Sequence, residues 1–415
     1  MIAALRGAHR LTLLGLFVVL IILVFGIFIA FQRGGNDFSV FYGSWYLVSH
    51  GRGPHINFET PDRYLYAPGL AWLLSPLGLL PKQLVFSLWC LAKALALYVV
   101  GKNLVRLSKL PESLSIGIAA GAIIMAARPL LIDFQYGQVN TFILAVCIWT
   151  LGRRWDGTST LSGHFGRWFL LAIAAIAKVF ATPLLLIPFF VKKDVPQKQI
   201  QYERLAVVLG LFVVLLLPIV SEGLKGNLQM LIHWKNALFD RGMPIESHNQ
   251  SISAFLARFF TGQPVHIIAL GPGSTKLFDL PLISSNLLKY ISALWTAVSS
   301  VLLLVLILRG PKTSVLRWVA LVVGLLVVPS HLVWKPYFIF IIPLAFVALS
   351  DWYRVRSRFR IVMFVLAFVA MNLNTFSFFP SLIAAKIESA SVMMFAHLAI
   401  LCSVLLTLKK EKNVF

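Results

Sequence analysis

Asp37 is the carboxylate whose place in the sequence most favours a chemical role. It lies just after the apolar run 11–31, where a membrane boundary is expected. An ionisable side chain at such a boundary is costly unless it is solvated or paired, so it marks a candidate site by default. Proton transfer is the chemistry open to a carboxylate there. The plain alternative is an acid in the loop at the end of a helix.

Other polar residues are expected on the same, outer face of the membrane. They are Tyr42, Gln138, Asn140, His248, Asn249, Gln250 and the segment 330–337 with His331, Trp334 and Lys335. Amide side chains suit the recognition of hydroxyl groups, although amides at helix ends often only satisfy the backbone. An indole ring offers a flat face to sugar C–H groups, and a lysine can pair with a phosphate. Anchoring in the membrane interface explains the aromatic residues nearly as well.

These residues must be positioned by membrane helices, because the composition is that of a membrane protein. The 415 residues are 59% hydrophobic and 13% charged, against about 25% charged in soluble domains. A hydrocarbon core about 30 Å thick needs roughly 20 mostly apolar residues per helix. The apolar runs predicted to span it are ten: 11–31, 84–101, 114–127, 138–151, 205–220, 285–308, 314–328, 337–350, 361–377 and 390–408. The predicted fold class is all-α, a polytopic helical bundle forming a single membrane domain over 1–415.

The basic residues indicate the orientation and exclude nucleic acid as a partner. With the N-terminus in the cytoplasm, most of the 37 Lys and Arg fall in cytoplasmic loops, so both termini are predicted to be cytoplasmic. The net charge of +22 does not form a basic face with stacking aromatics, as nucleic-acid binding would require. The run 11–31 is too long for a signal-peptide core and is predicted to be a retained anchor. The three cysteines lie inside apolar runs, so neither a disulfide nor a metal site is expected.

Three segments between the spans have expected roles. The outer loop 32–83 includes an apolar, proline-punctuated stretch at 64–81 that is too short to cross, so an interfacial helix is predicted there. The segment 168–191 lies between two basic loops that a single crossing would separate, so a re-entrant hairpin turning near Lys178 is predicted. A lysine at that depth is a site candidate or a snorkelling side chain. The segment 221–284 is predicted to be a long outer loop.

The motifs of the chain, taken in order, resemble those of glycosyltransferase family 87, within the GT-C class of multi-span membrane glycosyltransferases. They are DFSVFYGSWYLVSHGRGPH (37–55), YLYAPGLAWLLSPLGLLP (64–81), GQVN (137–140), KVFATP (178–183), NQS (249–251) with Arg258, and Trp334. One segment departs from the family. At 333–337 the chain has VWKPY where Ser-Trp-Asp-His-His is expected, so Lys335, Pro336 and Tyr337 replace an acid and two histidines.

The resemblance implies transfer of a hexose, with mannose as the first candidate, from a polyprenyl-phosphate donor. The acceptor would be a glycan or glycolipid on the outer face of the plasma (inner) membrane, with membrane lipids as further partners and no cofactor. Asp37 would be the general base of an inverting displacement. Lys178, Arg258 or Lys335 would hold the donor phosphate. Tyr66, in the interfacial stretch, joins the candidate substrate-binding residues.

Two other functions stay open. A transporter or lipid-linked glycan flippase would also have many spans, a broken helix and buried polar residues, and internal repeats would favour it. No repeat is evident between the two halves of the sequence. An enzyme-derived scaffold without activity is the other possibility, and the changed VWKPY segment is the feature that favours it.

Overall fold

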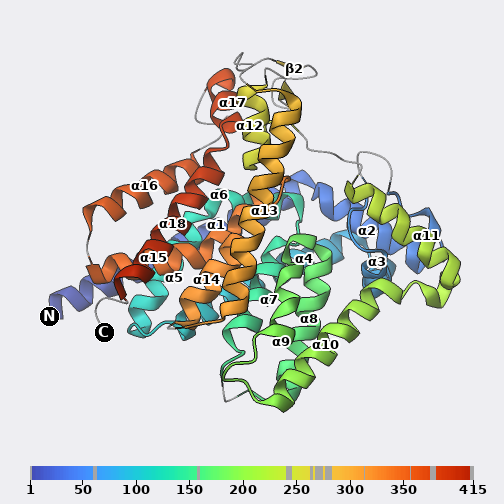
Figure 1. Ribbon diagram of the computed structural model, residues 1–415, viewed down its shortest axis with the longest axis horizontal. Coiled ribbons are helices and arrows are strands. Elements are labelled where there is room, and N and C mark those ends of the chain that lie inside the picture. Colours follow the sequence, from blue (N-terminus) through green and yellow to red (C-terminus); the bar gives the residue numbers. More distant parts are fainter. Residues whose placement is uncertain are drawn as a thin grey trace. The chain divides into compact units, whose positions relative to one another are not determined.

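Helices account for 81% of the described chain (Figure 1), and most of them follow the apolar runs of the sequence. The computed structural model describes residues 2–411 apart from 59–62, 157–158, 240–244, 262–264, 267–273, 276–282, 313, 356 and 374–379. The chain divides into two compact units. Unit 1 comprises Met1–Ile22, Leu104–Leu130 and Met243–Phe415, and unit 2 comprises Leu23–Asn103 and Leu131–Gly242. The expectation of a single membrane domain over 1–415 stays a prediction.

Unit 2 contains the predicted first outer loop and the predicted hairpin. Its elements are α2 (Asn36–Ser49), η1 (Gly53–His55), α3 (Pro68–Leu74), η2 (Ser75–Leu79), α7 (Asn140–Gly152), α8 (Leu161–Ala177), η3 (Val179–Leu186), α9 (Ile187–Phe190), α10 (Gln197–Leu216) and α11 (Ile219–Phe239). Three further helices are divided between the two units: α1 (Ile2–Arg33), α4 (Lys82–Leu107) and α6 (Ala127–Tyr136).

The helix α2 is held by an aromatic core. Phe38 and Trp45 are buried, and their separation of two helical turns puts them on one face. The ring centroid of Phe38 lies 4.7 Å from that of Phe86, and the centroid of Trp45 lies 5.6 Å from that of Trp89, both on α4. Aromatic pairs at such separations contribute about 0.5–1.5 kcal/mol each beyond their buried area. This packing fixes α2 and with it Asp37, which lies in the first turn of the helix.

Unit 1 contains the C-terminal helices and, among the described residues, two short strands. Its elements are α5 (Glu112–Met125), α12 (Ile252–Phe260), β1 (Val265–His266), β2 (Ser274–Thr275), α13 (Ser285–Arg309), α14 (Val315–Leu325), η5 (Lys335–Ile341), α15 (Ile342–Val355), α16 (Arg358–Asn372), α17 (Ser381–Ser389) and α18 (Val392–Glu411). The two strands pair antiparallel.

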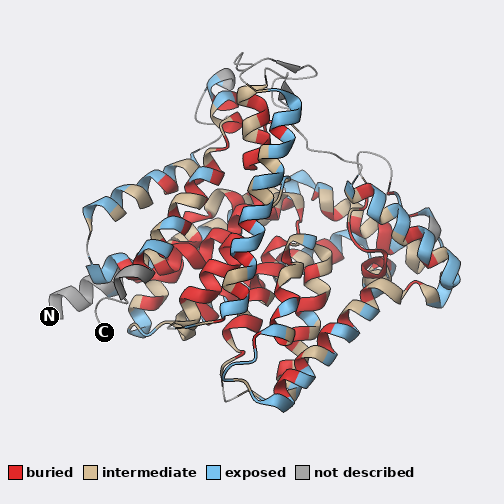
Figure 2. Cartoon of the chain, viewed as in Figure 1, coloured by how far each residue is buried: buried red, intermediate tan, exposed pale blue. Residues whose placement is uncertain are grey.

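The centre of unit 1 is formed by α14 and α15, which are buried along most of their length (Figure 2). A bidentate ion pair joins them, with Arg317 Nη2 and Nη1 lying 2.8 and 2.9 Å from the two carboxylate oxygens of Asp351. Arg317 also donates to Thr407 Oγ1 on α18. A buried charge that is paired and hydrogen-bonded in this way costs far less than a lone one.

Several helices are suited to crossing a membrane. Five are long and apolar enough: Leu11–Arg33, Lys82–Leu107, Gln197–Leu216, Ser285–Arg309 and Lys335–Val355. Two bent pairs, α5 with α6 and α17 with α18, would raise the number to seven if each pair is one span. Large apolar side chains stay exposed on such helices, and Leu11 and Leu294 are 70% and 64% exposed. Lipid contact accounts for this exposure, so the protein is a multi-pass membrane protein. The expectation of ten spans stays a prediction.

The predicted hairpin and interfacial helix coincide with breaks in the helical backbone. The helix α8 ends at Ala177, Lys178 is extended with φ −137° and ψ 98°, and η3 follows with Pro183 inside it. The stretch 64–81 contains the short helices α3 and η2. Re-entry and interfacial placement stay predictions. The predicted long outer loop, 221–284, contains α12 and most of α11, and part of it lies outside the described residues.

The contact of α3 with α10 requires a glycine and is testable. A Cβ on Gly69 would collide with the carbonyl group of Val214. We expect Gly69→Ala to force the two helices apart and to lower the free energy of unfolding by about 1–3 kcal/mol. Gly43→Ala on α2 is the control, because a Cβ there meets no described atom within 4 Å outside its own helix. Thermal unfolding in detergent measures both variants, and equal melting temperatures would contradict the close packing.

Candidate active site

Four of the residues predicted from the sequence meet in unit 2. Gln138 Nε2 donates a hydrogen bond to Asp37 Oδ2. Lys178 Nζ donates to the other end of the same amide, Gln138 Oε1, at 3.2 Å, and lies 5.6 Å from the centroid of the Tyr66 ring. Asp37 and Lys178 are partly exposed, whereas Gln138 is buried. One amide thus holds a carboxylate and an ammonium group close together at a partly open place.

Gln138 reaches Asp37 because the chain turns sharply between α6 and α7. Gly137 has a φ of 67°, in the left-handed region, and a Cβ there would lie 2.6 Å from the Cβ of Phe38. The Gly137 carbonyl accepts a hydrogen bond from Trp89 Nε1 at 2.9 Å. Glycine alone satisfies both the backbone conformation and the close approach to α2, so the turn is locked beside the carboxylate.

A buried ion pair that was not predicted lies behind this network. Lys93 Nζ on α4 is 2.8 Å from Asp133 Oδ2 on α6, and neither side chain is exposed. Asp133 also accepts hydrogen bonds from Asn140 Nδ2 at 3.0 Å and from Thr141 Oγ1 at 2.6 Å. Asn140 Nδ2 lies 3.4 Å from Gln138 Oε1 as well. The ion pair therefore holds the start of α7 and, through Asn140, the amide that contacts the candidate base.

The sequence does contain a signal for this pair. Lys93 lies in the middle of the apolar run 84–101, and Asp133 lies between the runs 114–127 and 138–151. Ionisable residues among apolar neighbours in a membrane protein are rare and are almost always paired or functional. Two such residues of opposite charge could have been singled out as an ion pair on this ground.

Tyr42 lies on α2 but makes its described contacts outside this network. Its hydroxyl donates to the carbonyl of Leu80 at 2.7 Å, and its ring stacks on that of Phe38 with centroids 6.2 Å apart. These contacts fasten α2 to the end of the 64–81 stretch. A role for Tyr42 in substrate binding stays a prediction.

The other predicted residues lie in unit 1, where two segments far apart in the sequence meet. Asn249 and Trp334 form an antiparallel β-bridge, and the Gln250 N–H donates to the carbonyl of Val333 at 2.7 Å. The Asn249 side chain donates to the carbonyl of His331 at 3.0 Å and accepts from the Val333 N–H at 3.1 Å. His331 thus contributes its backbone carbonyl group to this contact between the two segments. Through these contacts the side chain of Asn249 holds the two segments together.

Arg258 is fully buried and is bonded mainly to the backbone. Its Nε donates to the carbonyl of Ser389 at 2.8 Å, its Nη1 to the carbonyls of Glu246 and Asn249 at 2.9 and 2.8 Å, and its Nη2 to Ser391 Oγ at 2.7 Å. Burial lowers the pKa of Arg258 to about 10, so the guanidinium is protonated at neutral pH. Four of its N–H donors are therefore engaged in fastening α12 to the turn between α17 and α18.

Lys335 pairs with an acid that was not predicted. Its Nζ lies 2.5 Å from Glu388 Oε1, and His248 Nε2 lies 3.8 Å from the same oxygen. Gln250 Nε2 donates to the backbone carbonyl of Glu388 at 2.7 Å. Three predicted residues are thus brought together around Glu388, which lies in the last turn of α17 and is 1% exposed.

The predicted residues therefore form two groups, one in each unit, and the comparison with protein families decides the class of protein. The model of glycosyltransferase family 87 matches residues 64–329, which is more than half of the chain. The chain belongs to glycosyltransferase family 87. It is accordingly a membrane glycosyltransferase, acting on a donor and an acceptor in a membrane. No curated protein and no solved structure matches it.

The matched range of this family 87 glycosyltransferase includes some site candidates and not others. Tyr66, Gln138, Lys178 and Arg258 lie inside it, whereas Asp37 precedes it and Lys335 follows it. The resemblance of segments 37–55 and 333–337 to the family therefore stays a prediction.

The contribution of the buried Lys93–Asp133 ion pair to the stability of this family 87 glycosyltransferase can be tested by removing its charges. Lys93→Met leaves the Asp133 carboxylate buried without its cation, and Asp133→Asn leaves the ammonium group of Lys93 without its anion. Removing one partner of a buried ion pair costs about 3–5 kcal/mol, so we expect each single variant to lose much of its thermal stability. The double variant Lys93→Met, Asp133→Asn buries no charge and should recover at least half of the lost stability.

Thermal unfolding followed by size-exclusion chromatography measures this effect. Lys198→Met, on an exposed side chain at the start of α10, is the matched control and should unfold like the wild type. A double variant less stable than either single variant would show that the charges do not depend on each other.

Proposed function

We propose that this family 87 glycosyltransferase is a hexosyltransferase that uses a polyprenyl-phosphate sugar, with mannose as the first candidate. Its acceptor is a glycan or glycolipid on the outer face of the plasma membrane, and both termini lie in the cytoplasm. The observation that carries the proposal is the hydrogen-bonded group of Asp37, Gln138 and Lys178 in unit 2. It joins a carboxylate that can take a proton to a cation that can meet a phosphate.

The reaction is a single displacement with inversion at the anomeric carbon. The acceptor hydroxyl oxygen forms a bond to that carbon while the bond from the carbon to the phosphate oxygen breaks. The electron pair leaves with the phosphate, and Asp37 takes the hydroxyl proton as general base. The base and the leaving group then stand on opposite faces of the sugar, as in inverting glycoside hydrolysis.

Gln138 keeps the base in position for this step. Its Nε2–H group donates a hydrogen bond to Asp37 and orients the carboxylate. The N-terminal end of α2, where Asp37 lies, further favours a negative group. A carboxylate held by an amide and a helix end changes direction little between turnovers, which lowers the entropy cost of proton transfer.

Among the three candidate cations, Lys178 is the one we assign to the donor phosphate. Arg258 directs four N–H donors at acceptors of unit 1, and Lys335 lies against Glu388 at 2.5 Å. Lys178 is partly exposed, and its ammonium group donates to the same amide that donates to Asp37. An ammonium group beside the candidate base is placed to meet the phosphate of a bound donor and to stabilise the charge that develops on it.

The test of the base uses membranes that contain the full-length protein and radiolabelled polyprenyl-phosphate sugars. We expect Asp37→Asn to lower the rate of transfer to lipid or glycan by about 100- to 10,000-fold at unchanged protein level, because general base catalysis contributes about that much. Asp194→Asn, which changes an exposed acid in the loop between α9 and α10, is the control and should retain the wild-type rate. Full activity of Asp37→Asn would remove the assignment, and vesicles that move the lipid-linked sugar without covalent transfer would favour a flippase.

The assignment of Lys178 predicts a change in donor affinity. Lys178→Met removes a charge-assisted hydrogen bond worth about 1.5–3 kcal/mol, so the KM for the donor should rise by roughly 10- to 100-fold. Initial rates at varied donor concentration measure the effect, with Lys198→Met as the control on an exposed lysine. An unchanged donor KM would transfer the role to another cation.

A further inference from the structure

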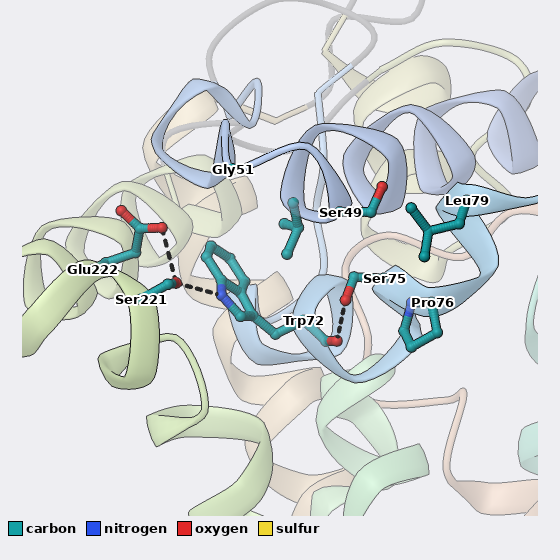
Figure 3. Close-up of a pocket in the computed structure, with 9 residues that line it drawn as sticks. Ser49, Gly51, Trp72, Ser75, Pro76, Leu79, Ser221 and Glu222 are labelled. Atoms are coloured by element: carbon teal, nitrogen blue, oxygen red, sulfur yellow. Dashed lines mark hydrogen bonds between the residues drawn. The ribbon is translucent and has the colours of Figure 1, made fainter.

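A pocket of about 640 Å³ lies at the far end of α2 from Asp37. Figure 3 shows it between the end of α2, the short helices α3 and η2, and the start of α11. Its walls include Val48, Ser49, Trp72, Ser75, Ser221 and Glu222. All of these residues belong to unit 2. None of the residues predicted from the sequence to bind substrate or to act as the base lines this pocket.

Hydrogen bonds fix the orientation of its aromatic and acidic side chains. Trp72 Nε1 donates to Ser221 Oγ at 2.8 Å, and Ser221 Oγ donates to Glu222 Oε1 at 3.0 Å (Figure 3). The second carboxylate oxygen, Oε2, has no hydrogen-bond partner among the described residues. A Cβ on Gly53 would lie 2.5 Å from the Trp72 ring and 2.9 Å from Glu222 Oε1. Glycine at this position is therefore what lets the indole and the carboxylate come together.

The hydroxyl groups of the pocket present acceptors rather than donors. Ser75 Oγ donates its hydrogen to the carbonyl of Trp72 at 2.8 Å, and Ser49 Oγ donates to the carbonyl of Tyr46 at 2.9 Å. The oxygen of Ser75 keeps its lone pairs for a ligand, and that of Ser49, which lies 3.1 Å from His50 Nδ1, has two lone pairs of which at least one stays available. Together with Glu222 Oε2, the walls offer acceptors and a negative charge.

This polarity decides between classes of ligand. A phosphate group would meet a carboxylate and acceptor oxygens, so the donor head group is disfavoured here. A sugar brings several hydroxyl donors for these acceptors, and its C–H face can lie on an indole ring. A concave site with an apolar aromatic wall and a few fixed polar groups is the usual form of a small-ligand site. The chemistry therefore matches a neutral carbohydrate.

The distance along α2 separates this pocket from the reacting groups. Ser49 follows Asp37 by twelve residues of one helix, which at 1.5 Å per residue is about 18 Å. A single sugar ring is too short to contact both ends. A ligand that occupies the pocket and also presents a hydroxyl to Asp37 must be a chain of several sugars.

We propose that this pocket is a remote subsite for a neutral oligosaccharide portion of the acceptor. The proposal rests on the proposed function, since it names the acceptor of the same reaction. Trp72 carries the sugar face, Glu222 accepts two or more hydroxyl hydrogens, and Ser49 and Ser75 complete the recognition. Binding energy gained here helps to position the acceptor hydroxyl at Asp37.

The first experiment measures binding without catalysis. Full-length protein in nanodiscs is given a panel of neutral tetrasaccharides built from mannose, glucose, galactose or arabinose, with the corresponding monosaccharides and inorganic phosphate as comparisons. Saturation-transfer NMR should detect binding of at least one tetrasaccharide, with no competition by phosphate. We expect Trp72→Ala and Glu222→Gln each to weaken that binding at least tenfold.

Two controls separate the subsite from folding and from the reaction. Trp352→Ala removes an exposed tryptophan of α15 outside the pocket and should bind like the wild type. Asp37→Asn should lose transfer yet retain oligosaccharide binding. Glu222→Gln changes no volume, so it keeps the test decisive if Trp72→Ala unfolds. No tetrasaccharide binding by the wild type, or equal binding by Glu222→Gln and the wild type, would overturn the proposal.

The second experiment measures transfer. With acceptors of one and of four or more sugars, Glu222→Gln should raise the KM of the long acceptor about tenfold and leave that of the short acceptor unchanged. Equal effects on both lengths would count against a remote subsite. If the wild type transfers no sugar to any acceptor, the proposed function fails, while the NMR result still decides whether the pocket binds carbohydrate.

Discussion

A charge buried among apolar helices must have a partner of opposite sign, and in unit 2 this requirement organises the candidate site. Lys93 and Asp133 satisfy it at 2.8 Å with no exposure of either side chain. Taking two charges out of water is costly, so the pair is maintained only where further hydrogen bonds fill its remaining positions. Asp133 obtains these from Asn140 and Thr141, the first residues of α7. The ion pair thus sets where α7 begins, and the residues just before that helix form the network around Asp37.

The turn between α6 and α7 connects the buried ion pair to the geometry of the site. Irregular backbone in a membrane protein is tolerated where protein or a water-filled cavity surrounds it. Gly137 meets the condition by lying against Phe38 and accepting a hydrogen bond from Trp89. Because the same turn carries Gln138, the position of that amide depends on two anchors, the aromatic core of α2 and the buried ion pair. A loose turn would let the amide leave the carboxylate, and the general base would lose its orientation.

Much of this could be predicted from the sequence, for reasons that differ between elements. The helices follow from apolar runs whose length matches a bilayer, and the break at Lys178 follows from a lysine and a proline inside an apolar segment. Asp37 and Gln138 were singled out as polar groups at expected membrane boundaries and Lys178 as a lysine at membrane depth, and the three meet in the structure. The family itself follows from the order of short motifs, and the match over 64–329 confirms it.

What could not be predicted was which polar groups serve each other. Glu388 contacts Lys335 and His248 through helix packing, which residue spacing does not encode. Asn249 and Arg258 are of residue types that also bind substrates. Their described contacts nevertheless join separate segments of the chain. A sequence does not show which backbone carbonyl groups a side chain will contact. A residue that bonds to such carbonyls therefore looks the same in the sequence as a residue that binds a ligand.

The partners of the acids offer a way to make that distinction. Asp133, Glu203, Asp351 and Glu388 each lie within ion-pair distance of a lysine or arginine, and their charges are consumed in holding helices together. Glu222 instead accepts a hydrogen bond from a neutral group, the hydroxyl of Ser221. A neutral donor orients a carboxylate while leaving its charge available for a proton or a sugar hydroxyl. In a chain with 37 basic and 15 acidic residues, an acid aimed by a neutral group is better suited to chemistry than to scaffolding. This is the physical reason that the remote carbohydrate subsite is assigned to Glu222. The base is assigned to Asp37 on other grounds, its partial exposure and its place in the first turn of α2.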